Sequence, residues 1–198
     1  MNNIIDTAYD FKKINVFTGP MFSGKTRLII DFIKENRYKC VVYSHYSNKH
    51  KNDSEEKKVI SSRAYDTVVS CIKINNLLEL CNSRKIDEFK TNDIKYLVFD
   101  EIQFFDDLIE FIEYYKNYEF IILLFGLELD YKKEKFGFLY KLEGDIDVTY
   151  NRLTGKCTFC NKKSIYTIRT IDYSNRILIG DEFYTPTCSD CYDKYSIL

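Results

Sequence analysis

Short, almost continuous apolar runs alternate with amphipathic segments over the first three quarters of the chain. Such runs predict buried β-strands, and apolar residues at helical spacing between them predict helices with one buried face. The predicted strands are 14–18, 40–44, 94–100 and 120–125, with weaker candidates at 67–72 and 147–150. The predicted helices are 26–36, 75–83 and 106–117. This alternation is typical of an α/β fold with a parallel sheet and helices on both faces.

The turn between the first strand and the first helix carries the pattern G-x-x-x-x-G-K-T at 19–26. A strand, a glycine-bounded turn and a helix in this order are the context of a Walker A motif, or P-loop. Backbone N–H groups of the turn and the helix dipole would converge on the phosphates of a nucleoside triphosphate, and Lys25 would add a full charge. The Thr26 hydroxyl would bind Mg²⁺. We therefore favour a P-loop NTPase-like fold over an ordinary glycine-rich turn, with phosphate-binding residues Gly19, Pro20, Met21, Phe22, Ser23, Gly24, Lys25 and Thr26.

The apolar run at 94–100 ends in two acidic residues, Asp100 and Glu101. An apolar strand that ends in Asp, in a chain with a P-loop, is typical of a Walker B element. Asp100 would then hold Mg²⁺ directly or through water, which leaves Glu101 for a second task. The alternative is a solvated strand end without a function.

A second unit begins near residue 152. Cys157-x-x-Cys160 and Cys188-x-x-Cys191 are separated by short β-like runs at 164–170 and 176–179. Two such pairs form a tetrahedral zinc site, and a closed set of four thiolates is structural. The alternative is four unrelated buried thiols. We expect a P-loop α/β domain at 1–151 and a small C-terminal zinc-ribbon (β) domain at 152–198, folded by one Zn²⁺.

Residues 126–142 mix charges with Phe and Tyr and show no clean period. They predict a mobile loop over the site, and a solvated connector is the alternative that composition leaves open.

Composition narrows the class of protein. The chain has 198 residues, of which 45% are hydrophobic, and a formal net charge of -1, so no global basic field attracts nucleic acid. No apolar run approaches the roughly 20 residues of a membrane span, and the N-terminal segment lacks the features of a secretory signal. The odd count of seven cysteines favours a reducing, cytoplasmic location, where paired C-x-x-C units are metal sites rather than disulfides.

Several longer motifs together resemble the type II thymidine kinases, the cellular and poxviral class. They occur in the order of that family and cover the chain from Ile14 to Tyr192. GPMFSGK and DE-x-Q-FF are far more specific than a bare Walker A pattern. The matching motifs are GPMFSGKT at 19–26, FDEIQFF at 99–105, DYKKEKFG at 130–137, LTGKCTFC at 153–160, YTIR at 166–169 and IG…Y…CSDCY at 179–192.

The resemblance implies transfer of the γ-phosphate of ATP to the 5′-hydroxyl of thymidine, or of deoxyuridine, in the salvage of DNA precursors. Asp100 resembles the magnesium-side aspartate of the family, and Glu101 resembles its catalytic base. This agrees with the chemistry, because the transfer needs a carboxylate at the hydroxyl and positive charge at the γ-phosphate. Arg63 and Arg169 are candidates for that charge, and the alternative for each is a surface arginine.

The resemblance also indicates a nucleoside pocket. An aromatic ring at Tyr131 would stack on the base, and Thr167 would lie near its 5-methyl group. Backbone groups of a lasso segment, 177–180, would contact the base edge. The side chains indicated are Met21, Phe104, Leu127, Tyr131, Thr167, Arg169 and Tyr184, with Ile177, Leu178 and Gly180 in the lasso. Core packing is the alternative for the aromatic residues.

Three features depart from the family pattern. Tyr131 stands where the family often has Phe, and Glu128 stands where it has Asp. The glycine pair before the last tyrosine is shortened to Gly180-Asp181, which shifts the lasso register by up to a residue.

The partners implied are ATP with Mg²⁺ and thymidine, in a homotetramer with feedback inhibition by thymidine triphosphate, and neither nucleic acid nor a membrane. One alternative is a P-loop ATPase whose zinc ribbon binds nucleic acid, although the ribbon lacks the basic and aromatic pattern of such modules. Another is a regulatory relative without turnover, against which the presence of Glu101 argues.

Overall fold

Six parallel strands form the centre of the molecule, in the order β5-β2-β6-β7-β1-β8. The structure is a computed structural model that describes residues 11–47, 59–61 and 68–196. The strands of this sheet are β1 (Ile14–Thr18), β2 (Cys40–His45), β5 (Ile72–Ile74), β6 (Tyr96–Asp100), β7 (Ile121–Gly126) and β8 (Val148–Arg152). The prediction of a parallel α/β sheet is confirmed.

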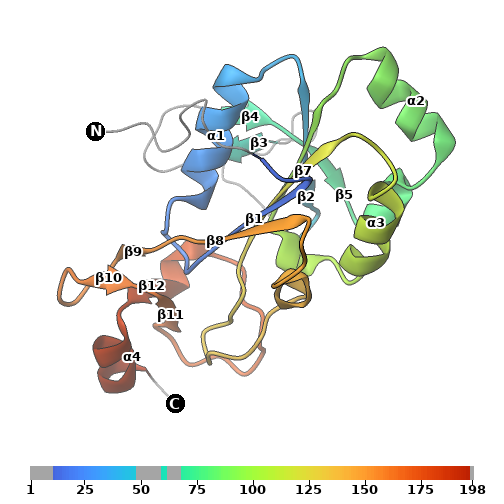
Figure 1. The fold of residues 1–198 in the computed structure, drawn as a ribbon. Coiled ribbons are helices and arrows are strands. Elements are labelled where there is room, and N and C mark those ends of the chain that lie inside the picture. The colour runs from blue at the N-terminus through green and yellow to red at the C-terminus, as the bar shows by residue number, and fades with distance from the viewer. Residues whose placement is uncertain (1–10, 48–58, 62–67, 197–198) are drawn as a thin grey trace.

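Helices cover both faces of this sheet, with α1 on one side and α2 and α3 on the other (Figure 1). Their bounds are α1 (Lys25–Glu35), α2 (Ser83–Thr91) and α3 (Leu108–Tyr115). Because successive strand residues point to opposite faces, Val16 packs in the cluster that contains α2 and α3 residues. Phe17 packs in the cluster that contains α1 residues. The near-continuous apolar runs are therefore explained by burial on both faces.

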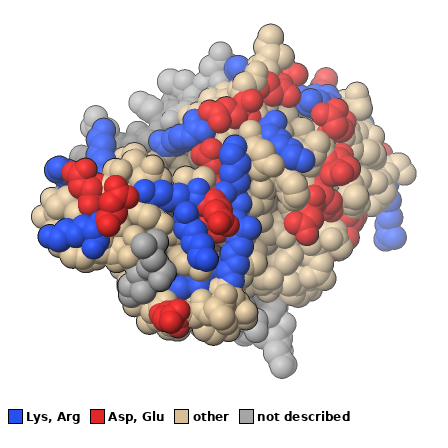
Figure 2. All heavy atoms as spheres, turned by 90° about the horizontal axis from the view of Figure 1, so that it is seen from below, with Lys and Arg blue, Asp and Glu red and all other residues tan. Residues whose placement is uncertain are grey.

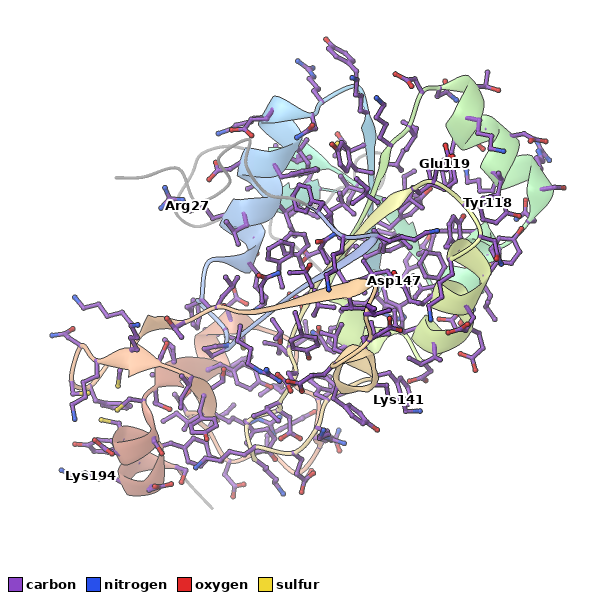
Figure 3. All side chains as sticks on the ribbon, in the orientation of Figure 1. Arg27, Tyr118, Glu119, Lys141, Asp147 and Lys194 are labelled. Carbon is purple, nitrogen blue, oxygen red and sulfur yellow. The ribbon has the colours of Figure 1, made fainter. Side chains whose placement is uncertain are left out.

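Helix α1 shows the expected amphipathic pattern. Leu28 and Ile29 are buried against the sheet. Arg27 points away from the sheet (Figure 3) and forms an ion pair with Asp31 one turn later at 3.6 Å. The helix thus begins at the P-loop lysine and buries one side over its whole length.

Two elements predicted before residue 94 are wrong in detail. The helix predicted at 75–83 is a short 3₁₀ turn, Leu77–Leu80, followed by a separate helix, α2. Asn82 divides them, because its side chain accepts a hydrogen bond from the Lys85 N–H at 2.9 Å and so caps the start of α2. The strand predicted at 67–72 is divided between two strands. Its first part, β4 (Val68–Ser70), pairs antiparallel with β3 (Val59–Ser61), and Ile72 begins β5 of the main sheet.

Short strands and one helix follow β8. They are β9 (Gly155–Lys156), β10 (Lys163–Ser164), β11 (Tyr166–Arg169), β12 (Tyr184–Thr187) and α4 (Ser189–Tyr195). β9 pairs with β10, and β11 pairs with β12, both antiparallel. The β-like run predicted at 176–179 is not a strand, and the strand that pairs with β11 is β12, later in the chain. Residues 170–183, the β11–β12 connection, are irregular apart from a 3₁₀ turn at Asp181–Phe183.

The segment between β7 and β8 contains a tight turn. Leu129 and Lys135 pair in an isolated antiparallel bridge, and residues 129–135 between them form what we call the 129–135 turn. A further 3₁₀ turn follows at Leu139–Leu142. Within the described ranges, every helix is too short or too polar to cross a membrane.

Replacing Asn82 with Ala is expected to lower the free energy of unfolding by about 1 kcal/mol, because the Lys85 N–H loses its cap. Urea denaturation followed by circular dichroism would measure the change. Asn82→Asp keeps an acceptor at the same place and serves as the matched control. Equal stability of the Ala variant and the unmodified chain would contradict this account of the break between the 3₁₀ turn and α2.

Candidate functional site

The P-loop and the acidic pair lie at one edge of the sheet. β7 lies between β1 and β6, and all three strands run in the same direction. Their carboxyl ends are Thr18, Gly126 and Asp100. In open α/β sheets this edge is where ligands bind. The predicted meeting of residues 19–26 with residues 100 and 101 therefore follows from the strand order.

Backbone geometry shapes the P-loop. Gly19 and Gly24 have positive φ angles of 151° and 92°, which favour glycine. A Cβ at Gly19 would lie 2.4 Å from the carbonyl oxygen of Leu153, so this glycine also permits close packing against the segment after β8. The turn ends where the Leu28 N–H donates to the carbonyl of Gly24 at 3.0 Å, the first turn of α1.

Lys25 lies inside the P-loop rather than in solvent. Its side chain is buried, and its Nζ donates to the carbonyl oxygens of Gly19 at 2.8 Å and Pro20 at 2.9 Å. Burial lowers the pKa of Lys25 to about 8, and the carboxylates of Glu101 and Asp100 oppose this shift. The ammonium group and the acidic pair are thus close enough to interact.

Asp100 is also buried, with 2% of its surface exposed. Burial raises the pKa of Asp100 to about 8, the charge of Glu101 acts in the same direction, and Lys25 opposes both. A buried carboxylate gains from a bound cation, and a buried ammonium gains from a bound anion. The edge is therefore suited to an anion accompanied by a divalent metal ion.

Glu101 follows Asp100 in a left-handed backbone conformation, with φ 56° and ψ 43°. Its Oε2 accepts a hydrogen bond from Nε2 of Gln103 at 2.5 Å. The Oε1 of Gln103 accepts from the Leu127 N–H at 3.0 Å, and this backbone donor fixes which end of the amide faces Glu101. Gln103 thus connects the carboxylate after β6 to the chain after β7.

Two glycines allow Gln103 to sit there. A Cβ at Gly126 would lie 2.5 Å from Gln103 Oε1, and a Cβ at Gly137 would lie 2.7 Å from Gln103 Cα. Gln103 itself is 3% exposed. The sequence motif contains this residue, but nothing in the local pattern assigns it a role.

Some predicted nucleoside-pocket residues come together in the structure. The Met21 N–H of the P-loop donates to Thr167 Oγ1 on β11 at 2.9 Å, which joins the P-loop to the ribbon strands. A cavity of about 310 Å³ lies beside this contact and is bounded by P-loop residues, the chain after β7 and β8, and β11. The Phe104 ring lies edge-on to Phe136, with centroids 5.6 Å apart.

Arg169 makes contacts that the sequence does not reveal. It is buried, and its terminal nitrogens donate to three carbonyl oxygens of the β11–β12 connection, those of Tyr173, Asn175 and Arg176. The hydroxyl of Tyr184 accepts from Arg169 at 3.1 Å and donates to the Leu178 carbonyl at 2.9 Å.

These bonds satisfy carbonyls that a strand would otherwise pair, which is why 176–179 is not a strand. The Arg169 guanidinium also lies 3.7 Å from the centroid of the Tyr131 ring. Its contacts hold the connection in shape, and its charge at the γ-phosphate stays a prediction. Of the other predicted site residues, Ile177 is exposed, and Arg63 lies outside the described residues.

The four cysteines of the two C-x-x-C pairs meet in space. The Sγ atoms of Cys157, Cys160, Cys188 and Cys191 all lie within 4.8 Å of one another. Zinc–sulfur bonds of about 2.3 Å in a tetrahedron place sulfurs at such separations, so the donor set fits zinc. The first pair lies on the β9–β10 hairpin, and the second lies at the start of α4. The prediction that these thiols form one cluster, able to hold a structural metal, is confirmed.

Two lysines near this cluster form ion pairs with acids of α4. Lys162 contacts Asp190 at 3.0 Å, and Lys133 contacts Asp193 at 3.1 Å. Figure 2, which views the molecule from this end, shows basic and acidic side chains next to one another across the face.

Known proteins are similar to this chain over most of its length. The family model described as thymidine kinase matches residues 12–192. The thymidine kinase of Ureaplasma urealyticum serovar 10 is 33% identical over 193 residues, which cover 91% of this chain and 84% of the relative. That of Choristoneura fumiferana entomopoxvirus is 33% identical over 191 residues, 91% of this chain and 96% of the relative. That of Fowlpox virus is 29% identical over 184 residues, 90% and 96% respectively.

Purified protein is expected to contain about one zinc ion per chain, because four thiolates share one ion. Cys157→Ser removes one ligand and should lower both the metal content, measured by elemental analysis, and the melting temperature. Cys81→Ser, at a half-buried thiol outside the cluster, is the matched control and should keep the metal. If the unmodified protein is folded but contains no metal, and Cys157→Ser has the same melting temperature, the assignment is wrong.

Proposed function

Because the chain belongs to the thymidine kinase family, we propose that it transfers the γ-phosphate of ATP to the 5′-hydroxyl of thymidine. Deoxyuridine is the second acceptor we propose, and the product would enter the salvage of DNA precursors. The observation that carries the proposal is the position of one buried ammonium beside two carboxylates at the P-loop edge. Phosphoryl transfer needs these groups and little covalent chemistry from the protein.

The P-loop would bind the phosphates of ATP. Its backbone N–H groups and the start of α1 would face the β- and γ-phosphates. Lys25 would exchange its contacts with the carbonyls of Gly19 and Pro20 for phosphate oxygens, and the anion would favour its protonated form. Thr26 and Asp100 would hold Mg²⁺, which neutralises charge on the phosphates when bound.

Glu101 would act as the general base. As the 5′-oxygen forms its bond to the γ-phosphorus, the bond from that phosphorus to the β–γ bridging oxygen breaks and ADP leaves. The proton of the hydroxyl passes to the carboxylate of Glu101. Gln103 supports this role, because its amide donates to one carboxylate oxygen and leaves the other for the substrate.

The nucleoside would lie between the P-loop and the β11–β12 connection. Thr167, held by the Met21 N–H, supports the assignment of the 5-methyl contact. We propose that Tyr131 stacks on the base with the ring face opposite Arg169, and that Phe104, Leu127 and Tyr184 line the pocket. Backbone groups of Ile177, Leu178 and Gly180 would contact the base edge.

Further properties come to this chain from its family. We propose a homotetramer with feedback inhibition by thymidine triphosphate, and a division into domains at 1–151 and 152–198. Arg63 and Arg169 are the candidates for the charge at the γ-phosphate. Four thiolates that bind one metal ion require a reducing compartment, so we propose the cytoplasm as the location.

Replacing Glu101 with Gln is expected to lower kcat by a factor of about 10² or more, because the amide cannot accept the proton. ATP binding should stay nearly unchanged, because Gln keeps the size of the side chain. Thymidine monophosphate formation and calorimetric ATP titration would measure the two effects. Asp106→Asn, at an exposed acid nearby, is the control. If Glu101→Gln has the kcat of the unmodified protein, Glu101 is not the base.

Gln103 offers a second test, with the pH profile as its readout. Gln103→Glu still accepts the Leu127 N–H, but it loses the donor to Glu101 and adds a like charge beside it. A second carboxylate favours the protonated, inactive form of the base, so the acid limb of the kcat–pH profile should move to higher pH.

Gln103→Leu should lower kcat by about tenfold and move that limb to higher pH by less than Gln103→Glu does, because it removes the hydrogen bond that favours the charged carboxylate but adds no like charge. Identical pH profiles for the Glu variant and the unmodified protein would contradict the contact between Gln103 and Glu101.

A further inference from the structure

The 129–135 turn carries Tyr131 and is organised by one buried side chain. The Oδ1 of Asp130 accepts from the N–H groups of Lys132 and Glu134, each at 2.9 Å. Asp130 is 7% exposed. Lys133, between these two donors, adopts a left-handed conformation with φ 64°. Hydrogen bonds from one Asp side chain to the backbone two and four residues later hold such a turn in one conformation.

The ammonium of Lys133 lies on two aromatic rings that come from different elements. It is 3.9 Å from the ring centroid of Tyr192 on α4 and 4.4 Å from that of Tyr166 on β11. The two rings contact each other edge to face, with centroids 5.4 Å apart. Asp193 accepts from the same ammonium at 3.1 Å. Cation–π contacts and an ion pair therefore act on Lys133 together.

Tyr192 makes a second contact with the same turn. Its hydroxyl donates to the carbonyl oxygen of Tyr131 at 2.6 Å. Tyr192 directly follows Cys191, and its N–H donates to the Cys188 carbonyl at 2.9 Å. Tyr192, which lies next to the thiol cluster in the chain, thus contacts both the backbone of Tyr131 and the ammonium of Lys133.

The β11–β12 connection holds the opposite side of the turn. Arg176 donates to Asp130 Oδ2 at 2.7 Å and to the Lys135 carbonyl at 2.7 Å. The Asp130 side chain is buried in this ion pair. The place of Tyr131 is therefore set from two sides by residues that follow β10 in the chain.

We infer that Lys133 and Tyr192 are positioning residues for nucleoside binding, which link the thiol cluster to the Tyr131 ring. This inference rests on the proposed function, because it takes Tyr131 as the residue that stacks on the base. A bound metal orders the start of α4, α4 places Tyr192, and Tyr192 fixes the turn with Tyr131 at the correct distance from the pocket. The metal site is then a determinant of nucleoside affinity as well as of stability.

Two variants that keep all four cysteines test this inference. Tyr192→Phe removes the hydroxyl but keeps the ring, and Lys133→Met removes the charge but keeps the apolar stem. Both should retain about one metal ion per chain. Each should raise the KM for thymidine by about threefold to tenfold, with kcat and the KM for ATP nearly unchanged. Lys85→Met, which breaks the Lys85–Glu88 ion pair on α2, is the matched control and should leave all three constants unchanged.

Hydrogen exchange supplies a readout that does not depend on activity. Backbone amides of residues 129–135 should exchange faster in both variants than in the unmodified metal-bound protein, while amides of β6 and β7 keep their protection. Unchanged exchange would overturn the inference, and so would faster exchange with an unchanged KM for thymidine. If the unmodified protein does not phosphorylate thymidine, the proposed function fails. Equilibrium binding of thymidine to the same variants then decides the inference in the same way.

Discussion

Burial of one ammonium group beside two carboxylates, at the carboxyl edge of a parallel sheet, is the constraint on which the rest of the structure depends. Lys25 is held inside the P-loop by two carbonyl oxygens, and Asp100 ends a strand that is buried on both faces. Neither charge is well solvated, so the arrangement is costly without bound ions of opposite sign. A triphosphate and its metal ion supply charges of the required signs at this edge.

The strand order brings these charged groups to the same edge of the sheet. β7 separates β1 from β6 and ends at Gly126, and this glycine and the Leu127 N–H that follows it position Gln103 against Glu101. The carboxylate is therefore oriented by a buried glutamine side chain, which the main chain after β7 holds in turn. Such preorganisation is what general base catalysis requires.

Features whose signal is local were predictable from the sequence. The P-loop, the strand ending in Asp100 and the two cysteine pairs each lie within a few residues, and the structure confirms the parallel sheet and the thiol cluster. The break at Asn82 also had a local signal, a capping residue, which the apolar pattern outweighed. The role of Gln103 had none, because it depends on a backbone donor 24 residues away.

The contacts of Arg169 could not be predicted from the sequence either. Its three carbonyl partners are in place only when the β11–β12 connection is folded around it.

The central claim is that this edge transfers phosphate to a nucleoside rather than to water. The most direct measurement is incubation of the purified protein with ATP, Mg²⁺ and a panel of nucleosides, with products separated and quantified. The account predicts thymidine 5′-monophosphate as the main product, formed in equal amount to ADP. ADP release without any nucleoside monophosphate, or ATP hydrolysis stimulated by nucleic acid, would contradict it.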